Sequence, residues 1–223
     1  MVGGVIPFVT RLAVSLCLVA PLFGAATDVP ALLKAVQDRY NRAQTVQVLF
    51  QQTYRMPGRA LKTESGELSL RKPGRMRWQY ESPKGKLFIS DGKQMFLFTP
   101  ASNRVQRMKV RESDDLRAPL GFLLGNLDFW RDFQRFVSRP DGPDVRLSAA
   151  PKSERAPYTD VEFVVTPSYQ IRYLRITGQD RSVMEFQFSG EKLNPPLAEG
   201  LFRFTPPAGV EVVEGVGEGE EEP

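Results

Sequence analysis

The chain has 223 residues, a formal net charge of +4 at pH 7, one cysteine and no histidine. The lack of histidine excludes histidine general bases and ordinary zinc sites, and a single cysteine excludes an internal disulfide. A chain of this length fits one domain, or at most two.

The first 26 residues have the pattern of a secretory signal peptide. Arg11 precedes an apolar run from Leu12 to Phe23, which small residues follow. The run is shorter than the roughly 20 residues that span a bilayer. Leu16 precedes Cys17, so Cys17 lacks the small neighbours of a lipid-anchor site. We therefore expect cleavage near Ala26 and an exported protein. Since Cys17 is removed with this segment and the chain has no histidine, we also expect no catalytic or metal-binding residue.

The two parts of the remaining chain differ in composition. Residues 27–213 form the expected domain, whereas residues 214–223 contain five glutamates and predict a disordered acidic tail. Without that tail the body is basic. This excess of positive charge either aids solubility or attracts anionic head groups or an acidic partner, and the composition leaves both open.

Residues 28–45, DVPALLKAVQDRYNRAQT, predict an amphipathic helix. Asp28 is a suitable N-cap and Pro30 suits the first turn. Its apolar stripe comprises Leu32, Leu33, Val36 and Tyr40.

After this helix the apolar period changes to two, which indicates strands. Residues 46–58 form the first, residues 63–73 a weaker one, and residues 75–81, RMRWQYE, the third. In the third strand Met76, Trp78 and Tyr80 share one aromatic face, and arginines lie on the other.

The segment KLFISDGKQMFLFTP, residues 86–100, predicts a hairpin. Asp91-Gly92 suits a two-residue type I′ turn that places Ser90 opposite Lys93. One face then carries Leu87, Ile89, Phe96 and Phe98, and the other carries Phe88, Met95 and Leu97. Both faces are apolar, so we expect cover on both sides, and the sequence does not identify which one faces the core.

Residues 112–137 predict two short helices, because Pro119, Gly121 and Gly125 interrupt the helical pattern. The first carries Leu116, Leu120, Phe122, Leu123 and Leu124, and the second carries Leu127, Trp130 and Phe133. This apolar load indicates a movable flap from Leu116 to Phe133 whose underside covers other apolar surface.

The remaining segments return to the strand period, at residues 144–149, 160–167, 170–178, 182–190 and 200–213. The fold class is therefore mostly β (α+β), an antiparallel sheet of about ten strands with three helices. Two interpretations remain open: helices and sheet enclose an ordinary dry core, or they enclose a hydrophobic chamber for a lipid.

Three segments, in this order and spacing, resemble the LolA family of periplasmic lipoprotein carriers. They are GELSLRKPGRMRWQYESP, LFISDGKQMFLFTP and LFRFTPPAGVEVV, and the resemblance extends from the first helix to Val213. It implies a curved antiparallel half-barrel of about 10–11 strands with three short helices covering its concave face.

The resemblance also implies a function without cofactor or catalysis. Such a carrier is monomeric and periplasmic, and it receives acylated lipoproteins from an inner-membrane lipoprotein-releasing ABC transporter. It shields their acyl chains in a hydrophobic cavity and passes them to an outer-membrane lipoprotein receptor. The number of acyl chains and the existence of a receptor here stay open.

We expect these side chains to line the cavity: Val48, Phe50, Met76, Trp78, Tyr80, Leu87, Ile89, Phe96, Phe98, Leu120, Leu123, Leu124 and Trp130. Plain core packing is the alternative for this set.

Two basic sites follow from the same region. In the resembled family an arginine before the proline of this segment holds the lid closed, and here Lys72 has that place, with Arg71 pointing to the opposite face. Lysine donates from a single point, which leaves its role as a lid lock in doubt. Arg71, Arg75 and Arg77 form a candidate docking patch, or else a solvated convex face.

Three other functions compete with the carrier. A LolA-like sensor would usually carry a second domain, and a LolA-like carrier of another amphiphile needs the same apolar chamber. A serine hydrolase would need a lysine base, and the sequence has neither Ser-x-x-Lys nor Gly-x-Ser-x-Gly.

Overall fold

The computed structural model describes residues 27–109 and 127–214. The expected signal peptide and residues 215–223 lie outside this range, as do the expected lining residues Leu120, Leu123 and Leu124. Among the described helices, none is long and apolar enough to cross a membrane.

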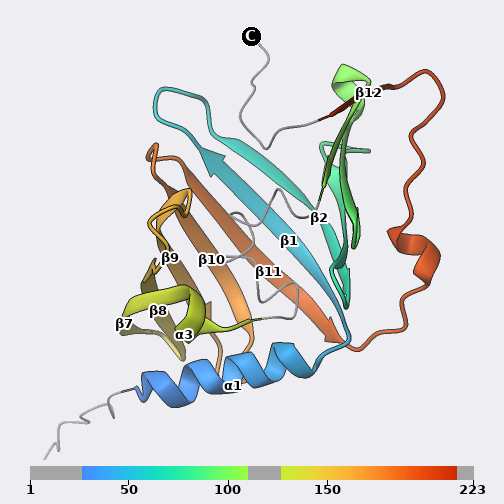
Figure 1. Cartoon of the computed structure of the whole chain (residues 1–223). Coiled ribbons are helices and arrows are strands. Elements are labelled where there is room, and N and C mark those ends of the chain that lie inside the picture. Colours follow the sequence, from blue (N-terminus) through green and yellow to red (C-terminus); the bar gives the residue numbers. More distant parts are fainter. Residues whose placement is uncertain (1–26, 110–126, 215–223) are drawn as a thin grey trace, which may run out of the picture.

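The described strands form one sheet of twelve, in the order β12-β6-β5-β4-β3-β2-β1-β11-β10-β9-β8-β7 (Figure 1). Their bounds are β1 Thr45–Arg55, β2 Lys62–Arg71, β3 Arg75–Ser82, β4 Leu87–Asp91, β5 Gln94–Thr99, β6 Arg104–Lys109, β7 Phe133–Asp141, β8 Asp144–Pro151, β9 Tyr158–Val165, β10 Ile171–Gly178, β11 Val183–Leu193 and β12 Glu211–Glu214. The predicted mostly β, antiparallel class is confirmed.

The order divides the sheet into two meanders. Strands β1 to β6 run outward from β1, strands β7 to β11 run inward to β11, and the two halves meet where Phe50 pairs with Phe188. All neighbouring pairs among the described strands are antiparallel except β12 with β6. A twisted sheet of this size curls, which produces a concave face.

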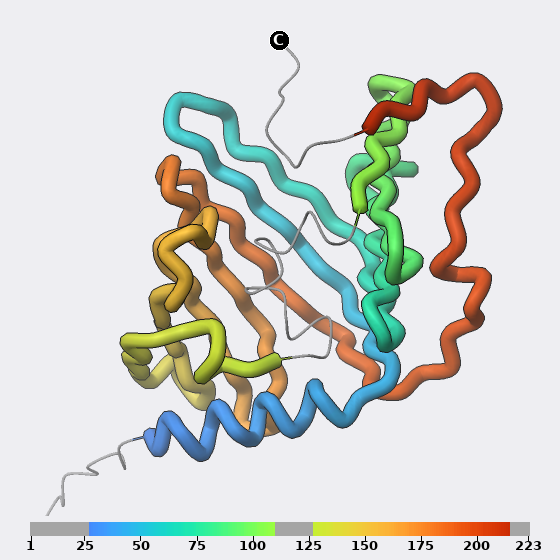
Figure 2. Tube along the Cα trace, viewed as in Figure 1, coloured from blue at the N-terminus to red at the C-terminus, as the bar shows by residue number. Residues whose placement is uncertain are grey.

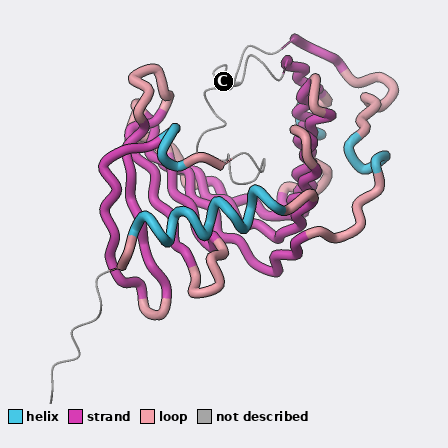
Figure 3. Tube along the Cα trace, turned by 60° about the horizontal axis from the view of Figure 1, so that its bottom comes forward, coloured by secondary structure: helices cyan, strands magenta, loops and turns pink. Residues whose placement is uncertain are grey.

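Helix α1 (Val29–Arg42) lies inside the curve of the sheet (Figure 3). The Oδ1 atom of Asp28 accepts a hydrogen bond of 3.0 Å from the backbone of Ala31, which confirms the predicted N-cap. Leu33, Val36 and Tyr40 are buried against the concave face. The predicted stripe therefore attaches the helix to the sheet.

One prediction about helices needs correction, and another lies outside the described residues. The described residues contain two α-helices, α1 and the one-turn α3 (Phe129–Asp132), and the first helix expected in the flap, from Leu116 to Leu124, falls outside them. Residues from Phe133 onward, predicted to be helical, form the edge strand β7. Phe133 and Phe136 both pack near Phe129, so burial of aromatic rings on the sheet overrides the helical spacing.

The predicted hairpin exists as β4 and β5, but its turn is longer than expected. Ser90 pairs with Met95 rather than Lys93. The Asp91 carboxylate accepts hydrogen bonds from the backbone nitrogens of Lys93 and Gln94, at 2.7 and 2.8 Å, and so closes a four-residue turn. Because the register differs by an even number of residues, the two predicted faces of the hairpin stay intact.

Residues 194–210, here called the C-terminal strap, run along the outer side of β4 to β6 (Figure 2). The strap contains the 3₁₀ turn η3 (Glu199–Phe202), and η1 (Pro100–Ser102) links β5 to β6. Phe202 is fully buried, and the Phe204 ring lies 5.5 Å from that of Phe96. The strap covers one apolar face of the hairpin, which confirms the predicted cover on that side, whereas Phe88 and Leu97 on the other face are half-buried.

Candidate functional site

The concave face carries a continuous group of aromatic side chains from both halves of the sheet. We call Phe50, Trp78, Tyr80, Phe186 and Phe188 the aromatic belt. Phe50 contacts Trp78 and Tyr80 edge to face, with ring centroids 4.8 and 5.2 Å apart. Phe186 lies 5.7 Å from Trp78 and stacks on Phe188. The belt thus bridges the junction between the two meanders.

The belt is buried, and the same face continues into less buried apolar side chains. Met76, Phe88, Ile176 and Met184 pack against the buried core that contains the belt and are only half-buried. Figure 1 shows that α1 and α3, the two described α-helices on this face, cross it toward one end of the long strands. The two helices therefore leave part of the apolar concave face incompletely buried.

Polar contacts hold α1 against this face at its C-terminal end. The Arg39 guanidinium lies 2.5 Å from Glu191 of β11, and the Tyr40 hydroxyl donates to the other carboxylate oxygen at 2.6 Å. The same hydroxyl accepts a hydrogen bond of 3.0 Å from the backbone of Ile171. Burial, reinforced by the Glu191 carboxylate, raises the pKa of Tyr40 far above its usual range, so its proton stays in place.

Two further contacts connect the last turn of α1 to other elements. Asn41 donates to the carbonyl of Leu127 and accepts from its backbone nitrogen, at 2.8 and 2.9 Å. The Lys72 ammonium donates to the carbonyl oxygens of Tyr40, at 3.2 Å, and Asn41. Burial lowers the pKa of Lys72. Helix carbonyls at a C-terminus lack partners within the helix, so a cation fits this position.

The strand registers divide the expected lining residues. Val48, Phe50, Trp78 and Tyr80 are buried on the concave face, and Met76 is half-buried beside them. Leu87, Ile89, Phe96 and Phe98 need correction: Trp78 pairs with Phe88, so these four lie on the opposite face under the C-terminal strap. Both faces of this hairpin are apolar, which is why the local pattern did not separate them.

Trp130 also differs from its expected place. Its side chain is 46% exposed, and its ring lies 5.0 Å from Phe136 at the edge of the sheet. Phe129, one residue earlier, is the member of α3 that is buried, 5.5 Å from Phe163.

Sequence reasoning missed the contribution of β11 to this site. Met184, Phe186 and Phe188 alternate along one strand, a pattern visible in SVMEFQFSG. Only the pairing of β11 with β1 places these rings beside Phe50. Sequence reasoning also left Phe88 out of the expected lining, because both faces of its hairpin are apolar.

The predicted docking patch also needs correction, because its arginines hold the C-terminal strap. Arg71 donates to the carbonyl of Leu197 at 2.7 Å, and Arg77 donates to that of Leu201 at 3.2 Å. Arg71 and Arg75 both lie within 3.6 Å of the Glu199 carboxylate. Burial lowers the pKa of Arg77. These side chains bind the strap to β2 and β3.

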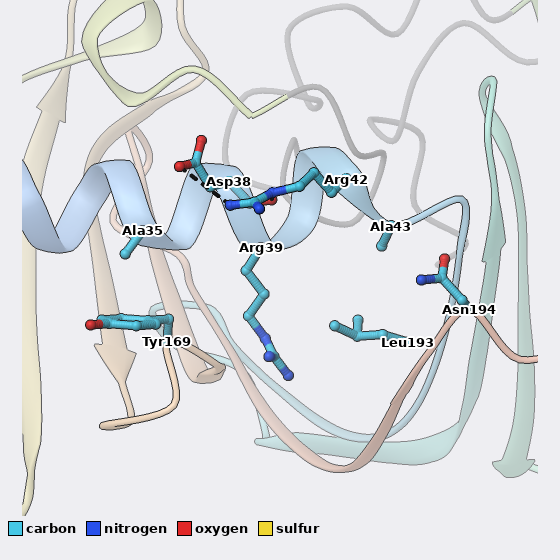
Figure 4. Close-up of a pocket in the computed structure, with 8 residues that line it drawn as sticks. All are labelled: Ala35, Asp38, Arg39, Arg42, Ala43, Tyr169, Leu193 and Asn194. Atoms are coloured by element: carbon cyan, nitrogen blue, oxygen red, sulfur yellow. Dashed lines mark hydrogen bonds and ion pairs between the residues drawn. The ribbon is translucent and has the colours of Figure 1, made fainter.

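A cavity of about 410 Å³ lies beside α1 and is distinct from the aromatic belt (Figure 4). Arg39 points between Tyr169 and Leu193 in this cavity, and Asp38 and Arg42 lie at its upper side. Arg39 is paired with Glu191 and Arg42 with Asp38, so the lining has no excess of charge for an ionic ligand. The described residues contain no group of acidic or cysteine side chains that could hold a metal ion.

Known proteins resemble this chain in sequence and in fold. The family model "Outer membrane lipoprotein carrier protein LolA" matches residues 41–205. The outer-membrane lipoprotein carrier protein of Nitrosospira multiformis is 30% identical over 174 residues, which cover 77% of this chain and 83% of that protein. Its counterpart in Proteus mirabilis is 29% identical over 203 residues, covering 91% of this chain and 97% of that protein.

A solved structure of an uncharacterized conserved protein from Thermus thermophilus has the same fold. Its TM-score is 0.51 at 12% identity, covering 85% of this chain and all of that one. The match of the family model over most of the chain decides the assignment. The chain belongs to the LolA family of outer-membrane lipoprotein carrier proteins.

Proposed function

We propose that this protein is a periplasmic carrier that takes acylated lipoproteins from the inner to the outer membrane and breaks no covalent bond. The observation that carries the proposal is the apolar concave face, which continues from the buried aromatic belt to half-buried Met76, Phe88, Ile176 and Met184. Acyl chains would lie against this face. An ABC transporter as donor and a membrane-bound receptor as acceptor complete the proposed route.

The energetics of such cargo require a binding face that is costly to open. Burial of acyl chains is favourable by about 0.8 kcal/mol per CH₂, so three chains of about 15 methylenes would gain on the order of 35 kcal/mol. That exceeds the practical ceiling of about 18 to 21 kcal/mol for non-covalent binding. Opening the face offsets part of this gain, because Leu33, Val36 and Tyr40 of α1 then lose their contacts with the sheet.

The polar contacts of α1 suit a cover that opens and recloses in one position. Glu191 lies in β11, Lys72 follows β2 and Leu127 precedes α3, and each binds the last two turns of the helix. Hydrogen bonds depend on direction, whereas apolar contacts tolerate sliding. We therefore assign Lys72 and Glu191 the role of holding the closed state.

Site-specific photocrosslinking tests where the cargo binds. A benzophenone amino acid replaces Met184, on the concave face, or Leu49, which is 50% exposed on the opposite face of the adjacent strand β1. Each protein is incubated with spheroplasts that contain newly made lipoproteins. We expect soluble, crosslinked lipoprotein with the probe at position 184 and none with the probe at position 49. Equal crosslinking at both positions contradicts binding on the concave face.

Native mass spectrometry of the periplasmic protein identifies the cargo. Bound acylated lipoprotein supports the carrier, and another bound amphiphile favours a LolA-like sensor or carrier of that molecule. A protein that is always empty, and that releases no lipoprotein from spheroplasts, overturns the proposal. Turnover of acyl esters would instead favour the hydrolase.

A further inference from the structure

Strand β12 (Glu211–Glu214) has an unusual place at the edge of the sheet. It pairs with β6 in parallel, whereas every other pair among the described strands is antiparallel. The register places Glu211 beside Arg104 and Glu214 beside Arg107. Since neighbouring positions along a strand alternate between faces, one ion pair lies on each face of the sheet.

The contacts that hold β12 are weak ones. The strand has four residues, and parallel pairing is slightly less stable per residue than antiparallel pairing. The Arg104 and Glu211 side chains are 39% and 62% exposed, and those of Arg107 and Glu214 are 42% and 71% exposed. Ion pairs this exposed contribute little to stability. Strand β12 therefore leaves β6 at low cost.

The chain before β12 acts as a tether. Phe202 and Phe204 anchor the C-terminal strap on the outer face of β4 and β5. Beyond them, Gly209 has a φ of +77° and open space where a side chain would be, and it contacts Asn103 through a hydrogen bond of 2.9 Å. A tethered strand has an effective concentration in the millimolar range, so it competes with outside segments for the same edge.

Loss of β12 exposes the backbone hydrogen-bonding groups of β6 next to the concave face. Met108 of β6 pairs with Met95 of β5 and continues the half-buried apolar surface toward the rim. Exposed edges of this kind bind extended segments by strand addition. Arg104 and Arg107 lie one on each face of the sheet, so a segment that pairs with β6 should carry acidic side chains three residues apart.

We propose that the edge of β6 is a binding site for an extended acidic segment of a partner protein, with the pattern Glu-x-x-Glu. The segment pairs in parallel in place of β12, and β12 is the built-in competitor that keeps the edge covered. The proposal needs no lipid cargo, so its test is independent of the carrier function.

Release of β12 within the full mature chain tests this site. The double substitution Glu211→Lys and Glu214→Lys places like charges opposite Arg104 and Arg107. A fluorescent peptide of residues 209–216 is then titrated, and its anisotropy is measured. We expect the peptide to bind the released variant at least tenfold more tightly than the wild type. The matched control, Glu218→Lys with Glu220→Lys, makes the same charge change outside β12 and should behave as the wild type does.

Charge reversal tests the selectivity of the site. The same peptide with lysine at both glutamate positions should not bind the released variant. It should bind a variant that carries Arg104→Glu and Arg107→Glu with Glu211 and Glu214 unchanged, because like charge then keeps β12 from covering the edge. Backbone amide exchange at Val105 and Arg107 should accelerate in the released variant and slow again with peptide, which separates edge exposure from general unfolding.

Three outcomes overturn the proposal. Equal affinity of the peptide for wild type and released variant means that β12 does not compete for its site, and absent binding to both means that no site exists. Equal binding of the glutamate and lysine peptides removes the acidic specificity. Dimerisation of the wild type by exchange of β12, seen by sedimentation and lost in the released variant, assigns the edge to a second copy of this chain instead.

Discussion

Gly66 of β2 lies close against the backbone of β3. A Cβ atom there would lie 2.0 Å from the carbonyl oxygen of Gln79 and 2.8 Å from the Cα of Tyr80. Gly66 also pairs with both Phe50 and Tyr80, whose rings contact each other edge to face. The absence of a side chain at Gly66 thus lets the two strands lie close enough for the rings of Phe50 and Tyr80 to meet above it.

We predict that Gly66→Ala lowers the free energy of unfolding by about 2 to 4 kcal/mol, because backbone rather than a flexible side chain must move. Urea denaturation followed by tryptophan fluorescence measures the change. Gly200→Ala is the matched control, since a Cβ atom at Gly200 meets nothing within 4 Å. A loss of stability as large in the control would show that the close contact is not the cause.

The carboxyl of Asp160 has a raised pKa. Burial is the main cause, the nearby Glu162 carboxylate adds to it, and Arg175 opposes it. When the folded pKa exceeds the unfolded one, the folded protein binds the proton more tightly. The stability from this group is therefore fully present below the unfolded pKa and is lost as pH rises through the folded pKa.

At pH 7 the ionised Asp160 thus destabilises the fold, and we predict that Asp160→Asn stabilises it. Because this side chain is only partly buried, the gain should be about 0.5 kcal/mol or less, and it should vanish near pH 3. Thermal denaturation at both pH values measures it. Asp180→Asn should act in the opposite direction at pH 7, since hydrogen bonds from Ser182 lower the pKa of Asp180. A gain for Asp160→Asn that persists at pH 3 would contradict the electrostatic cause.

At the scale of elements, the last turns of α1 are where the helix is coupled to the sheet. Lys72 follows β2 and binds two carbonyl oxygens of α1, while its backbone nitrogen donates to Gln44 at 3.0 Å. A lysine at this position therefore does bind backbone carbonyls of the helix, as expected of the arginine in the resembled family. The geometry requires only a point donor, because both acceptors are adjacent backbone carbonyls.

We predict that Lys72→Met lowers the free energy of unfolding by about 1 to 2 kcal/mol and speeds amide exchange in the last turn of α1. Hydrogen exchange with mass spectrometry measures the local effect. Lys72→Arg keeps donors in place and should restore protection. Lys34→Met removes a lysine from the exposed side of the same helix, where it pairs with Asp38, and should leave that turn unchanged. Equal exchange in all variants would mean that Lys72 does not hold the helix.

At the scale of the whole molecule, the two meanders and α1 share one apolar face, so cargo bound there contacts residues from both halves. A ligand that binds only the folded state stabilises it by mass action, by about 2.7 kcal/mol at 100 times its Kd. We predict that a triacylated lipopeptide produces a stabilisation of this size. Thermal denaturation below the critical micelle concentration measures it, with the deacylated peptide as control.

Absence of any shift would contradict acyl-chain binding to the folded protein. Stabilisation by both peptides would assign the binding to the peptide part instead of the acyl chains. Repeating the measurement with the Gly66→Ala variant tests whether the belt takes part, because its geometry is altered where Phe50 meets Tyr80.

Local patterns in the sequence predicted most of the elements. Asp28 and the stripe through Leu33, Val36 and Tyr40 identified α1, and alternation through Val46, Val48 and Phe50 identified β1. These predictions succeeded because helix and strand periods are properties of neighbouring residues. They failed at β7, where short aromatic spacing fits a helix and a bulged edge strand equally well.

What the sequence alone determined is therefore the mostly β class, the helix stripe, the alternating strands and the family. The tertiary structure decided which apolar face of the β4–β5 hairpin belongs to the concave face of the sheet. It also decided that Arg71, Arg75 and Arg77 bind the C-terminal strap. It also decided that Phe186 and Phe188 complete the aromatic belt. The physical reason is distance along the chain. Each of these contacts joins segments more than 100 residues apart or depends on which strand lies alongside another, and the period of a single strand carries no information about its neighbour.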